Sequence, residues 1–579
     1  MKSFPRSLMM TLTAGSLILG LSSFSLVSAQ GYRHASKNAP KISSDFPQKK
    51  GAERIDVIIQ FHPGKASLEA IRASGGEVKA NFHIINGVLA SVPVRALEGL
   101  AHNPNITYIS PDRELQGSLE YANPTVGAEL ARSWGWTGDG IGVAIVDSGV
   151  SDHPDFKELG ISRVVYNQSF IPGGTSTIDA YGHGTHVAGI VGGNGSSSTS
   201  RPGHTYTKTF FGIAPTAKLI NLQVLNGDGT GTDSAVIAAI QRAIELKSKY
   251  NIRVINLSLG RPVIESYETD PLCQAVETAW KAGIVVVVAA GNDGRNDSQG
   301  TNGYATIESP GNDPYVITVG AMKDMSSSVK ADDLIASYSS KGPTLLDHVV
   351  KPDLVAPGNR IISALASNSF LSQVSDNRVK VNYFALGGGN ADSNYYMRLS
   401  GTSMAAPMVS GAVALLLDKT PELTPAQLKA RLMKTASKSF PSSSISTDPV
   451  IGEIYTSYYD IFTVGAGYLD IVAALNNDDL VGGPALSPRA VYNPLTHSIR
   501  LQNGALSGGS IVWGDSIVWG NSLVWGDSLV WGDSMVWGDV LTGQTLVWGD
   551  SLVWGDTLVW GDSLQKAQQM NADAMTDEQ

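Results

Sequence analysis

The chain has 579 residues, of which 42% are hydrophobic and 16% charged, and it carries 62 glycines. This balance excludes a coiled coil or charge-driven disorder and favours a globular protein of two or three domains. Residues 1–117 hold 13 Lys and Arg against 8 Asp and Glu, so they carry +5 and the remainder −15 of the net −10. A nucleic-acid partner is therefore not expected. The single cysteine, Cys273, excludes an intramolecular disulfide and a cysteine-based zinc site.

The first 52 residues are predicted to be a secretory signal and a linker. Lys2 and Arg6 precede an uncharged, largely apolar stretch over 7–29 that ends in small residues suited to signal cleavage. An uncleaved anchor is the alternative, and no later stretch is long and apolar enough to span a bilayer. We therefore expect a signal peptide over 1–29, a linker over 30–52, and a secreted protein, extracellular or periplasmic, with no membrane span after signal removal.

Residues 53–117 are predicted to form a small ferredoxin-like sandwich of order βαββαβ. The dipeptide Asn86-Gly87 between two apolar runs is a strong hairpin signal. A generic α+β accessory domain is the alternative. The expected strands are Arg54–Phe61, Ala80–Ile84, Gly87–Val92 and Ile106–Ile109, and the expected helices are Ala66–Ala73 and Val94–Ala101.

Residues 118–475 follow a different pattern, in which short apolar runs alternate with helical stretches. This pattern predicts an α/β fold with a parallel sheet and helices on both faces, and active sites in such sheets lie beyond the carboxyl ends of the strands. The expected strands are Gly142–Val146, Lys218–Val224, Val254–Leu259 and Ile284–Ala289, with helices such as Ser234–Tyr250 and Pro271–Ala282.

Two candidate catalytic side chains follow from this arrangement. Asp147 comes directly after an apolar strand, where its carboxylate is either functional or a turn cap. His183 is flanked by glycines near a predicted helix start, so it can project into a cleft. His186, three residues later, raises a metal site as an alternative, but the spacing lacks a helical Glu partner and we expect no metal there.

A serine and an asparagine complete the candidate set. Ser403 lies in the first turn of an Ala-rich apolar helix, where free backbone N–H groups favour a developing negative charge. An ordinary helix-capping serine is the alternative. Asn292 ends an apolar strand, where it is either a turn residue or an amide donor to an oxyanion. Asp, His and Ser in this chain order, with a separate Asn, supply every role that acyl transfer needs.

Taken together, the motifs around these residues resemble those of the subtilisin-type serine proteases, over residues 118–475. The resemblance implies that Ser403 attacks the scissile carbonyl, that His183 transfers the proton, and that Asp147 orients the imidazole. Asn292 and the Ser403 backbone N–H would hold the oxyanion. The matching blocks are Val-Asp147-Ser-Gly, Gly-His183-Gly-Thr-His-Val-Ala-Gly, Ser258-Leu-Gly, Ala-Ala-Gly-Asn292, Ser339-Ser-Lys-Gly-Pro, Lys351-Pro-Asp-Leu-Val-Ala-Pro-Gly and Gly-Thr-Ser403-Met-Ala-Ala-Pro.

The resemblance also implies a substrate-binding region. The strand with Ser258, Leu259 and Gly260 would pair with the extended substrate backbone, and Ala289, Ala290 and Gly291 would form the opposite wall of the main pocket. Glu308 falls in a segment that resembles the base of that pocket. It either gives a preference for Lys or Arg at the primary site or points to solvent.

The resemblance further implies that residues 53–117 are an inhibitory propeptide that assists folding and then occupies the cleft, with autocleavage between Glu114 and Ala122. We thus expect a monomer that acts on protein or peptide substrates and has its own propeptide as intramolecular chaperone and inhibitor. No cofactor is required. Calcium is left open as a structural ion, because an insertion over Gly195–Lys208 hides the usual calcium loop.

The C-terminal region is predicted as a linker over 476–509, a hexapeptide repeat over 510–563 and a tail over 564–579. Eight of the eleven tryptophans lie between Trp513 and Trp560, mostly six residues apart, each before a Gly-Asp or Gly-Asn. Small hairpins, a β-solenoid and a disordered or export-related tail are the structural alternatives. The rival to an active protease is a catalytically weak protease scaffold that binds a partner through these repeats.

Overall fold

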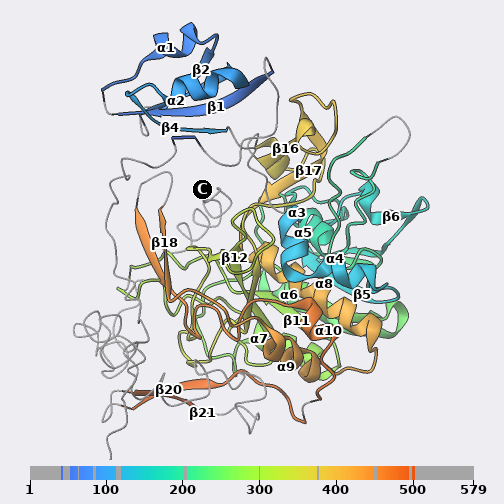
Figure 1. Cartoon of the computed structure of the whole chain (residues 1–579). Coiled ribbons are helices and arrows are strands. Elements are labelled where there is room, and N and C mark those ends of the chain that lie inside the picture. The colour runs from blue at the N-terminus through green and yellow to red at the C-terminus, as the bar shows by residue number, and fades with distance from the viewer. Residues whose placement is uncertain are drawn as a thin grey trace, which may run out of the picture. The chain divides into compact units, whose positions relative to one another are not determined.

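The computed structural model describes most of the chain between residues 41 and 502 (Figure 1). The predicted signal peptide, hexapeptide repeat and tail lie outside the described residues. The chain divides into two compact units, Met1–Leu115 and Gln116–Gln579. The described residues are 41–42, 53–62, 64–82, 86–111, 119–200, 205–298, 300–374, 377–447, 453–480, 482–493 and 498–502.

The first unit contains the predicted βαββαβ order. Its sheet has the order β2-β3-β1-β4, with neighbouring strands antiparallel. Alternate residues of β1, such as Val57 and Ile59, are fully buried, because one sheet face packs against Ile71 and Leu100 of the helices. The elements are β1 (Arg54–Phe61), α1 (Leu68–Ala73), β2 (Glu77–Phe82), β3 (Gly87–Pro93), η2 (Val94–Ala96), α2 (Leu97–Ala101) and β4 (Ile106–Pro111).

The second unit is built on an eight-stranded sheet of order β13-β12-β11-β10-β5-β9-β8, with β14 also paired to β12. The expectation of a parallel sheet needs one correction, because β13 runs antiparallel to β12. A return over fewer than a dozen residues is too short for the crossover that parallel pairing requires. The strands are β5 (Gly142–Asp147), β8 (Val164–Ser169), β9 (Lys218–Gln223), β10 (Ile252–Leu257), β11 (Val285–Ala289), β12 (Ile317–Lys323), β13 (Leu334–Ile335) and β14 (Leu354–Pro357).

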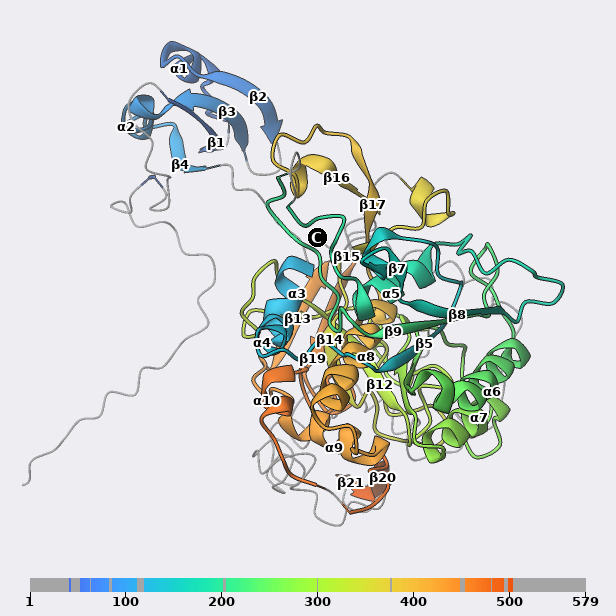
Figure 2. The ribbon, with the colours of Figure 1, turned by 90° about the vertical axis from the view of Figure 1, so that its right-hand side faces the viewer.

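Helices cover both faces of this sheet, as predicted (Figure 2). On β5, Val143 and Ile145 belong to the core shared with α5 (His183–Gly192) and α8 (Thr402–Lys419). Their neighbours Ala144 and Val146 face the core shared with α6 (Asp233–Tyr250) and α7 (Pro271–Lys281). Burial on both faces explains why these strands are continuous apolar runs rather than alternating patterns.

Among the described residues, no helix is long and apolar enough to cross a membrane.

Shorter helices and strands complete the second unit. These elements are α3 (Leu119–Val126), α4 (Ala128–Ser133), η3 (Pro154–Phe156), β6 (Lys157–Glu158), β7 (Ile161–Ser162), β15 (Ile361–Ala364), η4 (Leu371–Gln373), β16 (Arg378–Lys380), η6 (Val381–Tyr383), β17 (Asp392–Leu399), α9 (Pro425–Thr435), β18 (Ser443–Thr447), β19 (Ile454–Tyr458), α10 (Ile471–Leu475), β20 (Arg489–Asn493) and β21 (Ser498–Gln502).

Part of the stretch predicted as a linker, 476–509, contains two strands. β20 and β21 pair antiparallel, and Ala485 before β20 and Ala490 within it are both buried. The Pro488 carbonyl accepts a hydrogen bond from the Val350 backbone N–H at 2.8 Å. This segment therefore packs onto the sheet domain, because its few apolar residues reach the core through backbone pairing that composition alone does not indicate.

Candidate active site

Asp147 ends β5, at the carboxyl edge of the sheet, and is fully buried. Its Oδ1 accepts hydrogen bonds from the Ser148 backbone N–H at 2.7 Å and from His183 Nδ1 at 2.8 Å. Its Oδ2 is buried and has no hydrogen-bond partner within the described part of the chain. The carboxylate is thus held by one oxygen and directed at one imidazole.

His183 opens α5, and a third acid, Asp179, fixes the start of that helix. Asp179 is buried and accepts hydrogen bonds from the backbone N–H groups of Gly182 (2.6 Å) and Thr185 (2.7 Å) and from Ser148 Oγ (2.8 Å). Because these donors sit beside His183 and Asp147, Asp179 ties the two catalytic candidates into one rigid turn.

The local charges change how readily His183 takes up a proton. Burial alone lowers its pKa, but the charge and hydrogen bond of Asp147, with the charge of Asp179, outweigh burial and raise it above the ordinary histidine value. Neighbouring negative charges stabilise an imidazolium in this way. The ring is therefore suited to accept a proton in a step that creates positive charge.

His186 packs in the interior of the sheet domain. It is fully buried on α5, and its Nε2 lies 2.9 Å from the Ile361 carbonyl oxygen. Burial, followed by the nearby His183, lowers its pKa to about 3, so the ring is neutral. Within the described ranges, no group of three or more His, Cys, Asp or Glu side chains is placed to hold a metal ion.

Ser403 lies in the first turn of α8, directly after Gly401 and Thr402. Its Oγ donates a hydrogen bond to the Ser258 carbonyl oxygen at 3.1 Å, and Ser258 Oγ donates to the Ser403 carbonyl oxygen at 2.8 Å. This reciprocal pair joins the nucleophile candidate to the strand end that the sequence assigns to substrate binding.

The Asn292 amide is oriented by Thr402. Asn292 Oδ1 accepts hydrogen bonds from the Thr402 backbone N–H at 2.9 Å and from Thr402 Oγ1 at 3.1 Å. This fixes which end of the amide is the donor. A Cβ added to Gly401 would lie 3.5 Å from Asn292 Nδ2 and 3.7 Å from the Ser403 backbone nitrogen. Two N–H donors thus flank one small space beside the nucleophile, and the φ of +148° at Gly401 favours glycine there.

The predicted substrate-binding residues lie around the same strand ends. Ser258, Leu259 and Gly260 directly follow β10, and Ala289 ends the neighbouring parallel strand β11, with Ala290 and Gly291 next along the chain. The Glu308 backbone N–H donates to the Ala290 carbonyl oxygen at 3.1 Å. The structure therefore brings all of these predicted residues to one edge of the sheet.

Glu308 is half-buried and does not simply point to solvent. A Cβ added to Gly260 would lie 2.3 Å from Glu308 Oε2, and one added to Gly291 would lie 2.8 Å from Glu308 Cγ. The side chain therefore packs directly against both predicted walls.

Sequence reasoning missed Asp179, Ser148 and Thr402 as positioning residues. Ser148 and Thr402 each adjoin a predicted catalytic residue, and Asp179 stands four residues before His183 at the start of a predicted helix. An acid just before a helix is a capping signal, and this signal could have identified Asp179.

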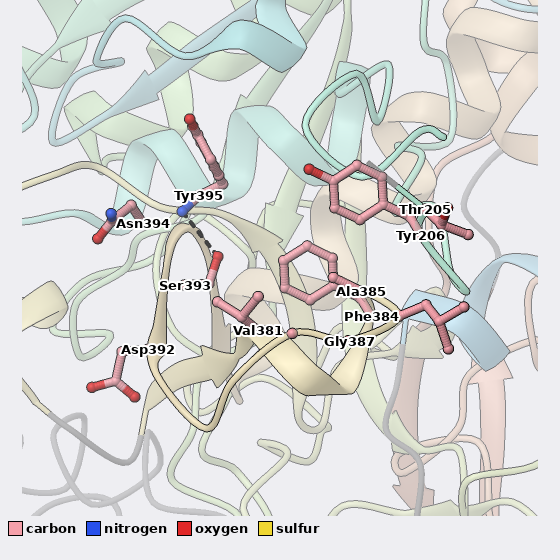
Figure 3. A pocket seen from close by; sticks show the side chains of 12 residues that line it. Thr205, Tyr206, Val381, Phe384, Ala385, Gly387, Asp392, Ser393, Asn394 and Tyr395 are labelled. Atoms are coloured by element: carbon pink, nitrogen blue, oxygen red, sulfur yellow. Dashed lines mark hydrogen bonds between the residues drawn. The ribbon is translucent and has the colours of Figure 1, made fainter. Parts of the chain in front are cut away.

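Away from these residues, a hollow of about 240 Å³ lies between the chain around Tyr206 and the segment from Val381 to Tyr395 (Figure 3). The Tyr206 and Phe384 rings stack with centroids 5.7 Å apart, and Ser393 Oγ accepts a hydrogen bond from the Tyr395 backbone N–H. None of the predicted site residues lines it.

Comparisons with known proteins assign the family. The subtilase family model matches residues 138–452. Serine protease AprX of Bacillus subtilis is 36% identical over 67% of this chain and 84% of its own length, and Subtilisin E of the same species is 33% identical over 64% and 80%. A crystal structure of a cold adapted subtilisin-like serine proteinase is 28% identical, with a TM-score of 0.37, over 52% of this chain and 84% of that one. On the sequence matches, this chain belongs to the subtilase family and is a serine endopeptidase.

Proposed function

We propose that the protein hydrolyses peptide bonds through an acyl-enzyme formed on Ser403, with His183 as general base and acid and Asp147 as the residue that orients it. The observation that carries the proposal is the buried 2.8 Å contact between His183 Nδ1 and Asp147 Oδ1. It fixes the tautomer that leaves Nε2 free to accept a proton.

Substrate binding prepares the nucleophile. In the free enzyme the Ser403 hydroxyl is engaged by the Ser258 carbonyl oxygen. When a substrate backbone N–H donates a hydrogen bond to this oxygen, it replaces the bond from the Ser403 hydroxyl. The hydroxyl is then able to rotate and donate to His183 Nε2. Binding of an extended peptide and activation of Ser403 are therefore coupled.

The reaction then proceeds in two steps, acylation of Ser403 and hydrolysis of the acyl-enzyme. Ser403 Oγ attacks the carbonyl carbon as its proton passes to His183 Nε2, and Asn292 Nδ2 with the Ser403 N–H hold the oxyanion. The protonated imidazole gives that proton to the leaving amine, which breaks the C–N bond. Water attacks the resulting ester by the same route in reverse and releases the acid product.

The first unit would serve this enzyme as its propeptide. Three features support the role: residues 53–111 form a compact sandwich of their own, the +5 of residues 1–117 opposes the −15 that follows, and this segment precedes the protease in the chain. We also propose secretion through the predicted signal peptide. Mass spectrometry of secreted Ser403→Ala should find the propeptide uncut, whereas the active protein should begin between Glu114 and Ala122.

Casein hydrolysis by the purified full-length protein tests the central proposal. We expect activity that a serine-directed inhibitor abolishes, that Ser403→Ala lowers by at least about 10⁴-fold, and that the exposed-site control Ser133→Ala leaves intact. No serine-dependent hydrolysis by the processed protein would instead favour a binding protein on a protease scaffold.

A further inference from the structure

Glu308 stands out because its carboxylate lies at the predicted substrate site without a partner. Among the described residues, no hydrogen bond or ion pair satisfies this side chain, although a half-buried carboxylate usually finds one. Arg261, whose backbone pairs with that of Ser309 next to Glu308, is held instead by Asp233 and Asp270 at 2.9 Å each. Within the described part of the chain, Glu308 thus has no basic partner to neutralise its charge when the carboxyl ionises.

The position of this carboxylate links it to the nucleophile. Its Oε2 lies against Gly260, two residues after the Ser258 carbonyl that binds Ser403 Oγ. Its Cγ lies against Gly291, the neighbour of Asn292. Any side chain at either glycine would collide with Glu308, so both glycines keep this space open for it. A substrate side chain that enters between the two strand ends would meet the carboxylate.

A second acid, Asp293, interacts electrostatically with Glu308. Its backbone N–H is held by Ser340 Oγ at 3.0 Å, and Ser340 Oγ also lies beside Gly291. Burial, followed by the charge of Asp293, raises the pKa of Glu308 to about 8, and burial raises the pKa of Asp293 as well. Asp293 is the one charged group in the described part of the chain that shifts Glu308. Two acids without a neutralising cation favour a cationic ligand.

We propose that Glu308, assisted by Asp293, is the specificity-determining residue of this enzyme and selects substrates with Arg or Lys immediately before the scissile bond. The inference rests on the proposed protease function and names its substrate class. A basic side chain between Gly260 and Gly291 forms an ion pair with Glu308 in a partly desolvated site, where such contacts are strong.

The preference for Arg and Lys before the scissile bond should increase with pH. Below about pH 8 the Glu308 carboxyl of the free enzyme is protonated, and above that it is charged. Arg and Lys stay protonated throughout this range. The preference for basic over apolar residues therefore rises as the pH increases from 6 to 9.

The test compares peptides that are identical except for Arg, Lys, Leu or Gln before the scissile bond. At pH 9 we expect kcat/KM for Arg and Lys to exceed that for Leu by about 10- to 100-fold, as a charged hydrogen bond allows. Glu308→Gln should bring this ratio near one and remove its pH dependence, while hydrolysis of the Leu peptide is retained. The exposed control Glu422→Gln should change neither.

A second variant keeps the test decisive if Glu308→Gln folds poorly. Asp293→Asn removes the repelling charge, so the rise of the Arg-to-Leu ratio should move to lower pH. A wild-type enzyme that hydrolyses casein through Ser403 but prefers Leu, or a basic preference that survives Glu308→Gln, would overturn the inference and leave the proposed function intact. Absence of any Ser403-dependent hydrolysis would overturn both.

Discussion

Two fully buried carboxylates, Asp147 and Asp353, sit in networks that differ in how completely their oxygens are paired. Asp353 accepts three hydrogen bonds and makes one further ion pair, two contacts at each oxygen. They come from Lys351 Nζ (2.7 Å), the Thr318 N–H (2.8 Å), Ser487 Oγ (2.5 Å) and Lys429 Nζ (3.1 Å). Asp147 uses Oδ1 alone and leaves Oδ2 without a partner among the described residues.

The difference separates a network that stabilises the fold from one to which we assign a catalytic role. Burial raises the pKa of Asp353, but the charges of Lys351 and Lys429 outweigh burial and hold it below the usual value. Lys429 in turn donates to the carbonyl oxygens of Pro314 and Val316 at 2.8 Å each. The Asp353 network, in which both oxygens are paired, fixes β14 and α9 in place. The Asp147 carboxylate, paired at one oxygen, keeps its charge available to the imidazolium of His183.

Asp147→Asn should have the largest effect, and only on activity. An amide cannot stabilise the imidazolium and favours the wrong tautomer, so we expect kcat to fall by about 10⁴-fold. The unfolding midpoint should stay nearly constant, because the side chain keeps its shape. Peptide hydrolysis and thermal unfolding of the same sample measure both. A midpoint that falls as far as that of an Asp353 variant would erase the distinction.

Asp353→Ala should show the opposite pattern. Removal of the shared carboxylate leaves two buried lysines uncompensated, which costs about 3–5 kcal/mol of the free energy of unfolding. Guanidinium unfolding measures the loss, and activity well below the midpoint should remain. The matched control is Asp152→Ala, whose surface ion pair with Lys157 adds little. Equal losses in the two variants would contradict the assignment.

Asn292 provides a smaller test at the chemical step. Asn292→Ala should lower kcat by about 10²–10³-fold with KM little changed, because one oxyanion donor is removed. Asn292→Asp keeps an acceptor for the Thr402 N–H and still removes the donor, so its kcat should fall at least as far. Recovery of kcat in Asn292→Asp would mean that the residue acts only by holding Thr402.

Asp179→Asn should give the smallest effect, a shift in pH dependence. The negative charge of Asp179 raises the pKa of His183, and catalysis needs the neutral ring. Without that charge the pKa of His183 falls, so the acidic limb of the kcat/KM profile moves to lower pH. A profile measured from pH 5 to 9 shows the shift. A limb that moves to higher pH would contradict the role of Asp179.

The motifs predicted where the candidate reactive groups lie in the fold, because each stands close to a strand end or a helix start. Apolar runs such as Gly142–Val146 place Asp147 at the sheet edge, and the structure puts β5 there. Partners that depend on distant segments were not visible: Asp179 reaches Ser148 across 31 residues, and Thr402 reaches Asn292 across 110. The antiparallel strand β13 and the pairing of β20 with β21 were missed because short strands carry too few residues for a hydrophobic period.

The contact of Ser487 with Asp353 sets a limit on C-terminal trimming. Ser487 supplies one of the four contacts of this carboxylate, and Pro488 accepts the Val350 N–H, so a chain cut at residue 475 would open the ion network. Among the described residues, the contacts of that network lie before residue 490. A cut after residue 502 would keep these contacts, so the position of a C-terminal cut decides whether Asp353 retains its full set of partners.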